Sequence, residues 1–191
     1  MDYARLRKIA DEPSEYAQHL EGAWTVEIGV GGPVMMMMSP VNRHERIAGR
    51  VRDHINWQIG STHPGWIAET GPEVEDPGVG RLRRPDVVVC EEEALDSDRD
   101  SLAPHEVLAC VEVVSQSNPS NYYVDKMADY PAMGISLYMI IDPRNGTITV
   151  HDDPYHGKYQ NSEPFIFGDT VPLGAWISDT SAFRRYGRGD A

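Results

Sequence analysis

The chain has 191 residues, a length typical of one domain with a substantial core, so we expect a single domain over residues 1–191. Its 17 Lys and Arg against 30 Asp and Glu give a formal net charge of −13, which disfavours a binder with an evenly basic, DNA-attracting surface. No apolar run approaches the ~20 residues of a membrane-spanning helix, and the first residues lack a signal-peptide segment, so we expect a cytoplasmic protein with no membrane partner.

The first forty residues predict a helix followed by a strand hairpin. Residues 3–20 have the spacing of an amphipathic helix, which Pro13 is expected to break. Residues 24–28 and 34–38 are strand-like and flank a glycine-rich turn. We therefore expect an N-terminal hairpin with a helix before it.

A longer helix is predicted over about residues 42–59, with Ser39-Pro40 at its start. Within it, aliphatic side chains recur every four residues and predict a stripe that faces the core. We expect Arg46 and Arg50 to stay exposed on other faces of the helix. The stripe consists of Ile47, Val51, Ile55 and Ile59, with Ala48 and Trp57 beside it.

Short apolar runs separated by polar segments organise the rest of the chain. The predicted elements are strands at 66–69, 85–91, 107–115, 137–141 and 147–151, and a helix at 119–133. The strand, helix and strand over 107–141 imply a parallel pair with a crossover helix. The predicted fold is therefore α/β, with a mixed sheet flanked by helices. Cys90 and Cys110 fall within strands and are expected to be buried free thiols.

Two acidic residues lie at the ends of apolar runs. Asp86 leads into Val87-Val88-Val89-Cys90, and Glu112 interrupts the run from Val107 to Ser115. A carboxylate in a buried strand is costly unless a metal or another cation compensates it. Two such carboxylates on neighbouring strands would suit a divalent cation. The alternatives are a simple turn at Pro85-Asp86 and a solvent-facing Glu112.

Basic residues gather in three places despite the acidic total. A local basic groove is compatible with this distribution, although net charge makes an ordinary solvated surface the more expected outcome. The clusters are Arg43, Arg46, Arg50 and Arg52 with His44; Arg81, Arg83 and Arg84; and Arg184, Arg185 and Arg188.

Several short segments, spread over residues 26–143, resemble the Uma-type restriction endonuclease family, a branch of the PD-(D/E)XK nuclease superfamily. Each segment is weakly specific alone, and their common order and spacing make the resemblance specific. The segments are Val26-Glu27-Ile28 with Gly31, Met37-Met38-Ser39-Pro40, His44-Glu45-Arg46-Ile47, Arg84-Pro85-Asp86-Val87, Val111-Glu112-Val113-Val114-Ser115, Asp125-Lys126 with Tyr130, and Gly134-Ile135 with Tyr138 and Ile141-Asp142-Pro143.

The resemblance implies a restriction-endonuclease-like core and roles for particular residues. Asp86 and Glu112 match the two acids that would hold Mg²⁺ or Mn²⁺. The usual lysine position after the second acid is occupied by Val114, and Lys126 on the following helix matches the displaced lysine of this branch. His44 is expected near the site as a fourth catalytic residue, and Glu27 also matches a position typical of the family. Tyr122 departs from the family pattern. This departure bears on the loop from Ser115 to Tyr122 and leaves the match of Asp86, Glu112 and Lys126 unchanged.

Two functions are therefore expected from different classes. The first is a Mg²⁺-dependent endonuclease that hydrolyses DNA, in which Lys126 stabilises developing charge or orients the attacking water. The alternative is a catalytically silent binding or regulatory module that acts as a homodimer. The presence of Asp86, Glu112 and Lys126 favours the first function, and the net charge of −13 favours the second. In either case, burial and mutual repulsion are expected to raise the pKa of both Asp86 and Glu112.

Overall fold

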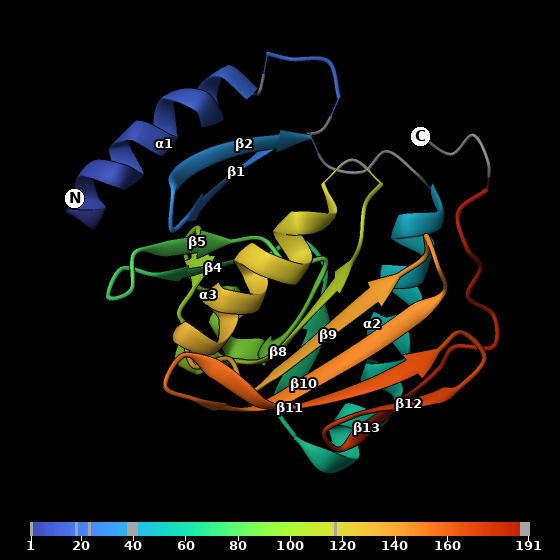
Figure 1. The fold of residues 1–191 in the computed structure, drawn as a ribbon. Coiled ribbons are helices and arrows are strands. Elements are labelled where there is room, and N and C mark those ends of the chain that lie inside the picture. The colour runs from blue at the N-terminus through green and yellow to red at the C-terminus, as the bar shows by residue number, and fades with distance from the viewer. Residues whose placement is uncertain (1, 18, 23, 38–41, 117, 188–191) are drawn as a thin grey trace.

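The computed structural model of the protein describes residues 2–17, 19–22, 24–37, 42–116 and 118–187 (Figure 1). The chain begins with helix α1 (Tyr3–Ala17), which packs against the hairpin of β1 (Trp24–Gly29) and β2 (Gly32–Met37). The predicted hairpin is confirmed. The predicted break at Pro13 is wrong, because the helix continues through it. Burial of Ala10 against the hairpin offsets the backbone hydrogen bond that a proline removes.

The hairpin belongs to a small sheet built largely from polar segments. Its strand order within the described residues is β2-β1-β5-β4-β7, with β4 (Glu73–Asp76), β5 (Arg81–Arg83) and β7 (Ser101–Leu102). Sequence patterns left β4 and β5 undetected, because each strand buries only one apolar side chain, Val74 or Leu82. This part of the sheet is therefore held mainly by backbone hydrogen bonds between strands, and few apolar side chains contribute to it.

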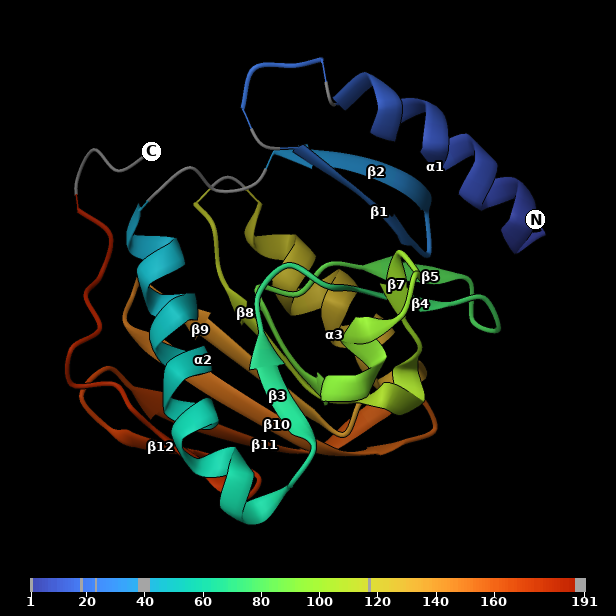
Figure 2. The same cartoon turned by 180° about the vertical axis from the view of Figure 1, so that it is seen from behind.

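A larger mixed sheet forms the centre of the molecule (Figures 1 and 2). Within the described residues its strand order is β11-β10-β9-β8-β6-β3. The predicted parallel pair is confirmed in β8 and β9, and the other neighbours are antiparallel. The strands are β3 (Trp66–Glu69), β6 (Val87–Glu91), β8 (Val107–Val113), β9 (Leu137–Asp142), β10 (Thr147–Tyr155) and β11 (Lys158–Ile166). The strand predicted at 147–151 thus extends further and pairs with β11, whose exposed polar face gave little signal.

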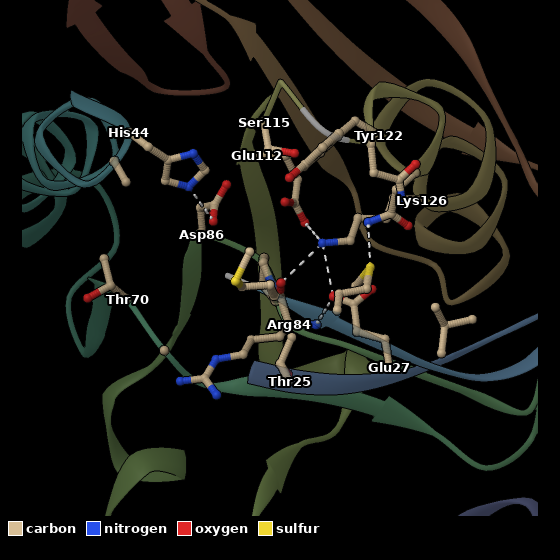
Figure 3. A pocket seen from close by; sticks show the side chains of 18 of the residues that line it. Thr25, Glu27, His44, Thr70, Arg84, Asp86, Glu112, Ser115, Tyr122 and Lys126 are labelled. Atoms are coloured by element: carbon tan, nitrogen blue, oxygen red, sulfur yellow. Dashed lines mark hydrogen bonds and ion pairs between the residues drawn. The ribbon is translucent and has the colours of Figure 1, made fainter. Parts of the chain in front are cut away.

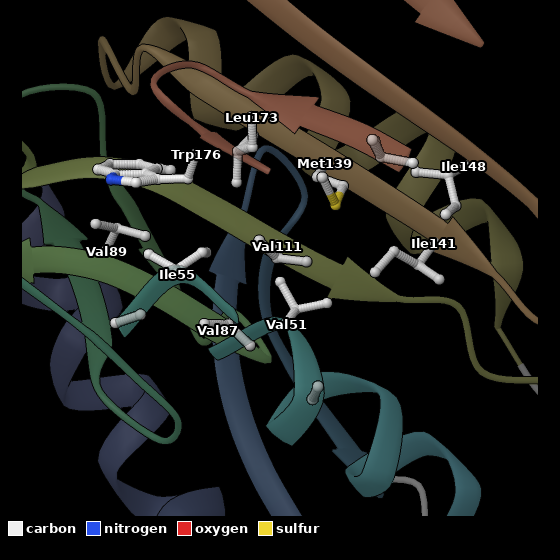
Figure 4. Packing of buried hydrophobic residues seen from close by; sticks show 14 of the residues in the cluster. Val51, Ile55, Val87, Val89, Val111, Met139, Ile141, Ile148, Leu173 and Trp176 are labelled. Atoms are coloured by element: carbon white, nitrogen blue, oxygen red, sulfur yellow. The ribbon is translucent and has the colours of Figure 1, made fainter. Parts of the chain in front are cut away.

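Helix α2 (Asn42–Thr62) covers one face of this sheet, and its predicted apolar stripe is buried against the strands (Figure 4). Arg46 is exposed as predicted, whereas Arg50 is half-buried. Trp57 does not join the stripe and is 86 % exposed, because a residue two positions from Ile55 faces the other side of the helix. Residues 38–41, including the predicted start at Ser39-Pro40, lie outside the described residues.

The opposite face of the sheet is covered by the crossover helix. A π-helical turn, Asn121–Asp125, leads into α3 (Lys126–Ala132), and a buried Cys90 and Cys110 lie in the core beneath. Gly134 ends this helical segment with a φ of +81°, a conformation that favours glycine. The sheet thus presents α2 and α3 on opposite sides, as Figures 1 and 2 show together.

Smaller elements complete the described fold. Strands β12 (Thr170–Leu173) and β13 (Trp176–Asp179) form a hairpin against α2, and 3₁₀ turns occupy Glu92–Asp96 and Pro104–Glu106. None of the described helices is both long and apolar enough to cross a membrane. The α/β fold with a mixed sheet, flanking helices and an N-terminal hairpin is confirmed.

Candidate active site

The two predicted acids meet at one end of neighbouring strands. The register of the antiparallel β6–β8 pair places Val87 opposite Val111, so Asp86 and Glu112 are the next residues on each side. Both line one cavity of about 570 Å³ (Figure 3). The two side chains therefore share a face of the sheet, as the sequence predicted.

Asp86 is held by a histidine and a backbone amide. His44, buried on α2, places Nε2 2.9 Å from Asp86 Oδ1, and the Val113 N–H donates to Asp86 Oδ2 at 2.7 Å. The expected rise in the pKa of Asp86 is wrong. Desolvation does raise it, but the charge and hydrogen bond of His44, with the charge of Lys126, lower the pKa below its ordinary value. Asp86 is thus held in its ionised form.

Glu112 is fully buried and contacts the predicted lysine. Its Oε1 accepts hydrogen bonds from Lys126 Nζ and from the Tyr130 hydroxyl, each at 2.6 Å. Desolvation raises the pKa of Glu112 to about 8, and the opposing charge of Lys126 offsets only part of that rise. The direction agrees with the prediction for this acid. The pKa of Lys126 is also raised, since the charges of Glu112 and Glu27 outweigh its desolvation.

The Lys126 amine points into the acidic cluster, as predicted. Besides Glu112, it donates to the Arg84 carbonyl at 3.1 Å and forms an ion pair with Glu27 Oε1 at 3.0 Å. The Tyr122 ring lies beneath the amine, with its centroid 5.6 Å away. Lys126 is therefore a buried cation held between two carboxylates.

A second group of buried charges extends from this cluster, and sequence reasoning missed it. Arg83 Nη1 donates to Glu27 Oε2 at 2.7 Å, and its guanidinium also pairs with Asp129. Asp129 further accepts from Arg81. The only signal available was the position of Glu27 in the family pattern. We call Glu27, Arg83, Asp129 and Lys126 the buried ion network.

Two more groups lie at or next to the cavity. Tyr186, near the C-terminus, donates to the Val114 carbonyl at 3.0 Å and lies 3.5 Å from His44 Nδ1. Arg84 lines the cavity, and its Nε atom is buried without a hydrogen-bond partner among the described residues. An unpaired buried donor is unfavourable, so Arg84 is a group that a ligand could satisfy.

The donor set fits a small divalent cation that keeps part of its water shell. Among the described residues, no three His, Cys, Asp or Glu side chains converge as a complete metal cage. Mg²⁺ in phosphoryl-transfer sites is commonly held by one or two carboxylates together with waters and substrate phosphate oxygens. Asp86 and Glu112 supply such a pair, and each carboxylate oxygen can accept more than one contact.

Comparison with known proteins places this arrangement in a family. The model of the Uma2 family, described as "Putative restriction endonuclease", matches residues 13–181. The chain belongs to the Uma2 family. The resemblance drawn from the sequence is thereby confirmed, and the matched segment includes all four predicted site residues, namely His44, Asp86, Glu112 and Lys126.

A solved structure supports the fold of this Uma2 chain. The crystal structure of "a putative nuclease belonging to DUF820 from Anabaena variabilis ATCC 29413" superposes with a TM-score of 0.60 and 18% sequence identity. The match covers 83% of this chain and 87% of that one. At this identity the likeness shows a shared fold alone. The search of curated proteins returned no match.

Proposed function

We propose that this protein is a divalent-metal-dependent endonuclease that hydrolyses phosphodiester bonds in DNA, and that residues 1–191 form one nuclease-like domain. The observation that carries the proposal is the adjacency of Asp86 and Glu112 in one cavity, with the Lys126 amine 2.6 Å from Glu112. Membership of a family described as restriction endonucleases supports the same reaction.

Asp86 and Glu112 would hold Mg²⁺ or Mn²⁺, which supplies Lewis acidity toward phosphate oxygens when bound. His44 positions Asp86 and favours its charged form. Lys126 fixes the orientation of Glu112, since its amine is itself held by hydrogen bonds to Glu112 and the Arg84 carbonyl and by the ion pair with Glu27. Its charge still stabilises negative charge that develops nearby. Arg84, with its unpaired Nε, is the group that we expect to touch the phosphate directly.

The alternative is a catalytically silent module that retains the fold and acts as a homodimer. The net charge of −13 favours it, because a polyanionic substrate is repelled by most of such a surface. Metal binding discriminates between the two functions. A nuclease requires a bound divalent ion, and Asp86→Ala should abolish that binding. A silent module does not need the ion.

The direct test is cleavage of supercoiled plasmid and of single-stranded DNA by the wild-type protein. We expect nicking or cutting that requires Mg²⁺ or Mn²⁺ and stops when EDTA removes the ion. Gel electrophoresis of the products measures it, and a Glu112→Gln preparation purified in parallel controls for contaminating nucleases. Absence of cleavage of both DNAs over a wide protein concentration range, with the protein folded, would exclude the nuclease and leave the silent module.

Replacement of Lys126 tests its role within the site. We expect Lys126→Met to lower the cleavage rate by about 10²–10³-fold, the usual effect of removing one preorganised charge-stabilising group. Metal binding, measured by calorimetry with Mn²⁺, should persist, because the carboxylates remain. Lys126→Arg should recover part of the rate, since it restores the charge but not the compact amine geometry.

Folding must be separated from catalysis in this experiment. Lys126→Met leaves Glu112 and Glu27 without their shared cation, so its thermal midpoint should also fall. Rates are therefore compared well below that midpoint, with circular dichroism confirming a folded variant. A folded Lys126→Met protein that cleaves at the wild-type rate would remove Lys126 from the mechanism.

A further inference from the structure

A further cavity lies between the first half of α2 and the C-terminal segment. It measures about 440 Å³, and arginine residues dominate its lining. No Asp or Glu lies among the described residues that line it. We call it the arginine groove and define it by Arg43, Arg46, Arg50 and Arg184. In a chain with a net charge of −13, a cavity of this composition is unusual.

Helical geometry explains how three of these arginines share one side. Arg43, Arg46 and Arg50 follow the i, i+3, i+7 spacing of a single helix face, next to the buried stripe. The C-terminal segment lies alongside, as Figures 1 and 2 show, and Arg43 Nη1 donates to the Arg185 carbonyl at 2.7 Å. Arg184 from that segment then faces the same cavity. The position of Arg188, which belongs to the same sequence cluster, lies outside the described residues.

Two arginines of the groove have side chains without a direct partner among the described residues. The side chains of Arg46 and Arg50 form no hydrogen bond or ion pair there, and Arg184 Nη1 donates to the Ser181 and Phe183 carbonyl oxygens. The carboxylate of Asp179 accepts the Ser181 N–H at 2.9 Å, and the pKa of this acid is lowered mainly by Ser181 and to a smaller extent by the charges of His54 and Arg50. The guanidinium groups of Arg46 and Arg50 are thus available to an external anion.

The groove and the catalytic cavity lie on opposite flanks of the first turns of α2. His44, Glu45 and Ala48 line the catalytic cavity, whereas Arg43, Arg46 and Arg50 line the groove, and the two sets of lining residues do not overlap. From Arg43 to Arg50 the helix rises about 10 Å. A strand that leaves the catalytic cavity across the first turn of α2 would therefore place neighbouring phosphates against these arginines.

We infer that the arginine groove binds the phosphodiester backbone of DNA where it extends past the first turn of α2 from the catalytic cavity. The inference rests on the proposed function for its substrate. Guanidinium groups match phosphate oxygens with paired hydrogen bonds. The acidic remainder of the surface repels DNA, so this basic strip determines where the duplex lies relative to Asp86 and Glu112.

The test measures DNA binding and its salt dependence. Fluorescence anisotropy with a labelled 20-base-pair duplex, in Ca²⁺ in place of Mg²⁺, compares wild type with the double variant Arg46→Gln and Arg50→Gln. We expect at least about tenfold weaker binding. The slope of log K against log salt should shrink by about 2, since each lost phosphate contact removes about 0.9.

A matched control removes the same charge elsewhere. The double variant Arg52→Gln and Arg99→Gln alters a half-buried arginine on α2 and an exposed arginine elsewhere, which pair with Asp53 and Glu106 respectively. It should bind DNA with the wild-type slope. An equal loss of affinity and slope in both double variants would show a general charge effect and overturn the groove, as would a wild-type protein that does not bind the duplex.

A small substrate separates this inference from the proposed function. Hydrolysis of bis(p-nitrophenyl) phosphate by the wild-type protein reports on the catalytic cavity, because this diester is too short to extend along α2. Groove-dependent DNA binding without hydrolysis of either substrate would support the groove and reject the nuclease. Hydrolysis with DNA binding that is unchanged by Arg46→Gln and Arg50→Gln would support the nuclease and reject the groove.

Discussion

Glu112→Gln should lower the rate of DNA cleavage by about 10³-fold or more. The amide keeps the size of the side chain, and its oxygen can still accept from Lys126 and Tyr130, which both contact Oε1. It removes the negative charge and one of the two proposed ligands. A catalytic metal contributes several kcal/mol of transition-state stabilisation, and each 1.36 kcal/mol corresponds to a tenfold rate.

Metal binding provides a second measurement on the same variant. We expect Mn²⁺ to raise the thermal midpoint of the wild type and to leave that of Glu112→Gln nearly unchanged, because a bound ligand stabilises only the folded state. Glu93→Gln is the matched control, since it makes the same chemical change on an exposed acid away from the cavity. Wild-type cleavage and an undiminished Mn²⁺ shift in Glu112→Gln would contradict the metal site.

Arg83→Met should lower the free energy of unfolding by about 3–5 kcal/mol. The Arg83 side chain is only 4% exposed and lies between Glu27 and Asp129, which are equally buried. Removal of the guanidinium leaves two carboxylates in a low-dielectric environment, with Lys126 and Arg81 as their remaining cations. Burial of these two carboxylates has a desolvation cost, which Arg83 offsets in the wild type. In the variant that cost is no longer compensated.

Urea denaturation followed by circular dichroism measures this loss. Arg83→Lys should retain part of the stability, because it keeps the charge but cannot bridge both carboxylates with a planar fork. Arg99→Met is the comparison at the surface, where the pair with Glu106 should contribute little. A stability of Arg83→Met within about 1 kcal/mol of the wild type, as for an ordinary surface substitution, would show that the buried ion network is not structural.

Local sequence signals predicted Asp86 and Glu112 because both acids interrupt or precede strongly apolar runs. The same reasoning located the stripe of Ile47 and its neighbours on α2. Lys126 and His44 required the family pattern, because a lone helical lysine or histidine carries no signal of what the fold brings next to it. Their geometry in the structure agrees with the expected positions.

Two features of the site could not be predicted from the sequence, because both depend on contacts between residues that are far apart along the chain. The ordinary pKa trend for a buried acid failed at Asp86. Desolvation raises the pKa, but the charge and hydrogen bond of His44, which comes from another element, together with the charge of Lys126 and the Val113 N–H, outweigh it. Arg83 was assigned to a basic surface cluster, yet it is buried between carboxylates from β1 and α3. From composition alone, such charged side chains are expected to be solvated. Only the tertiary contacts show that they are buried.

The buried ion network also sets the order in which the catalytic cavity can form. Glu27 and Lys126 stand 3.0 Å apart although 99 residues separate them (126 − 27). Contacts this distant in sequence close large loops and form late compared with local ones. A chain emerging from the ribosome therefore has no complete cavity until α3 has been synthesised and has docked against the N-terminal hairpin. Any ligand of this cavity would therefore meet it only in the finished fold.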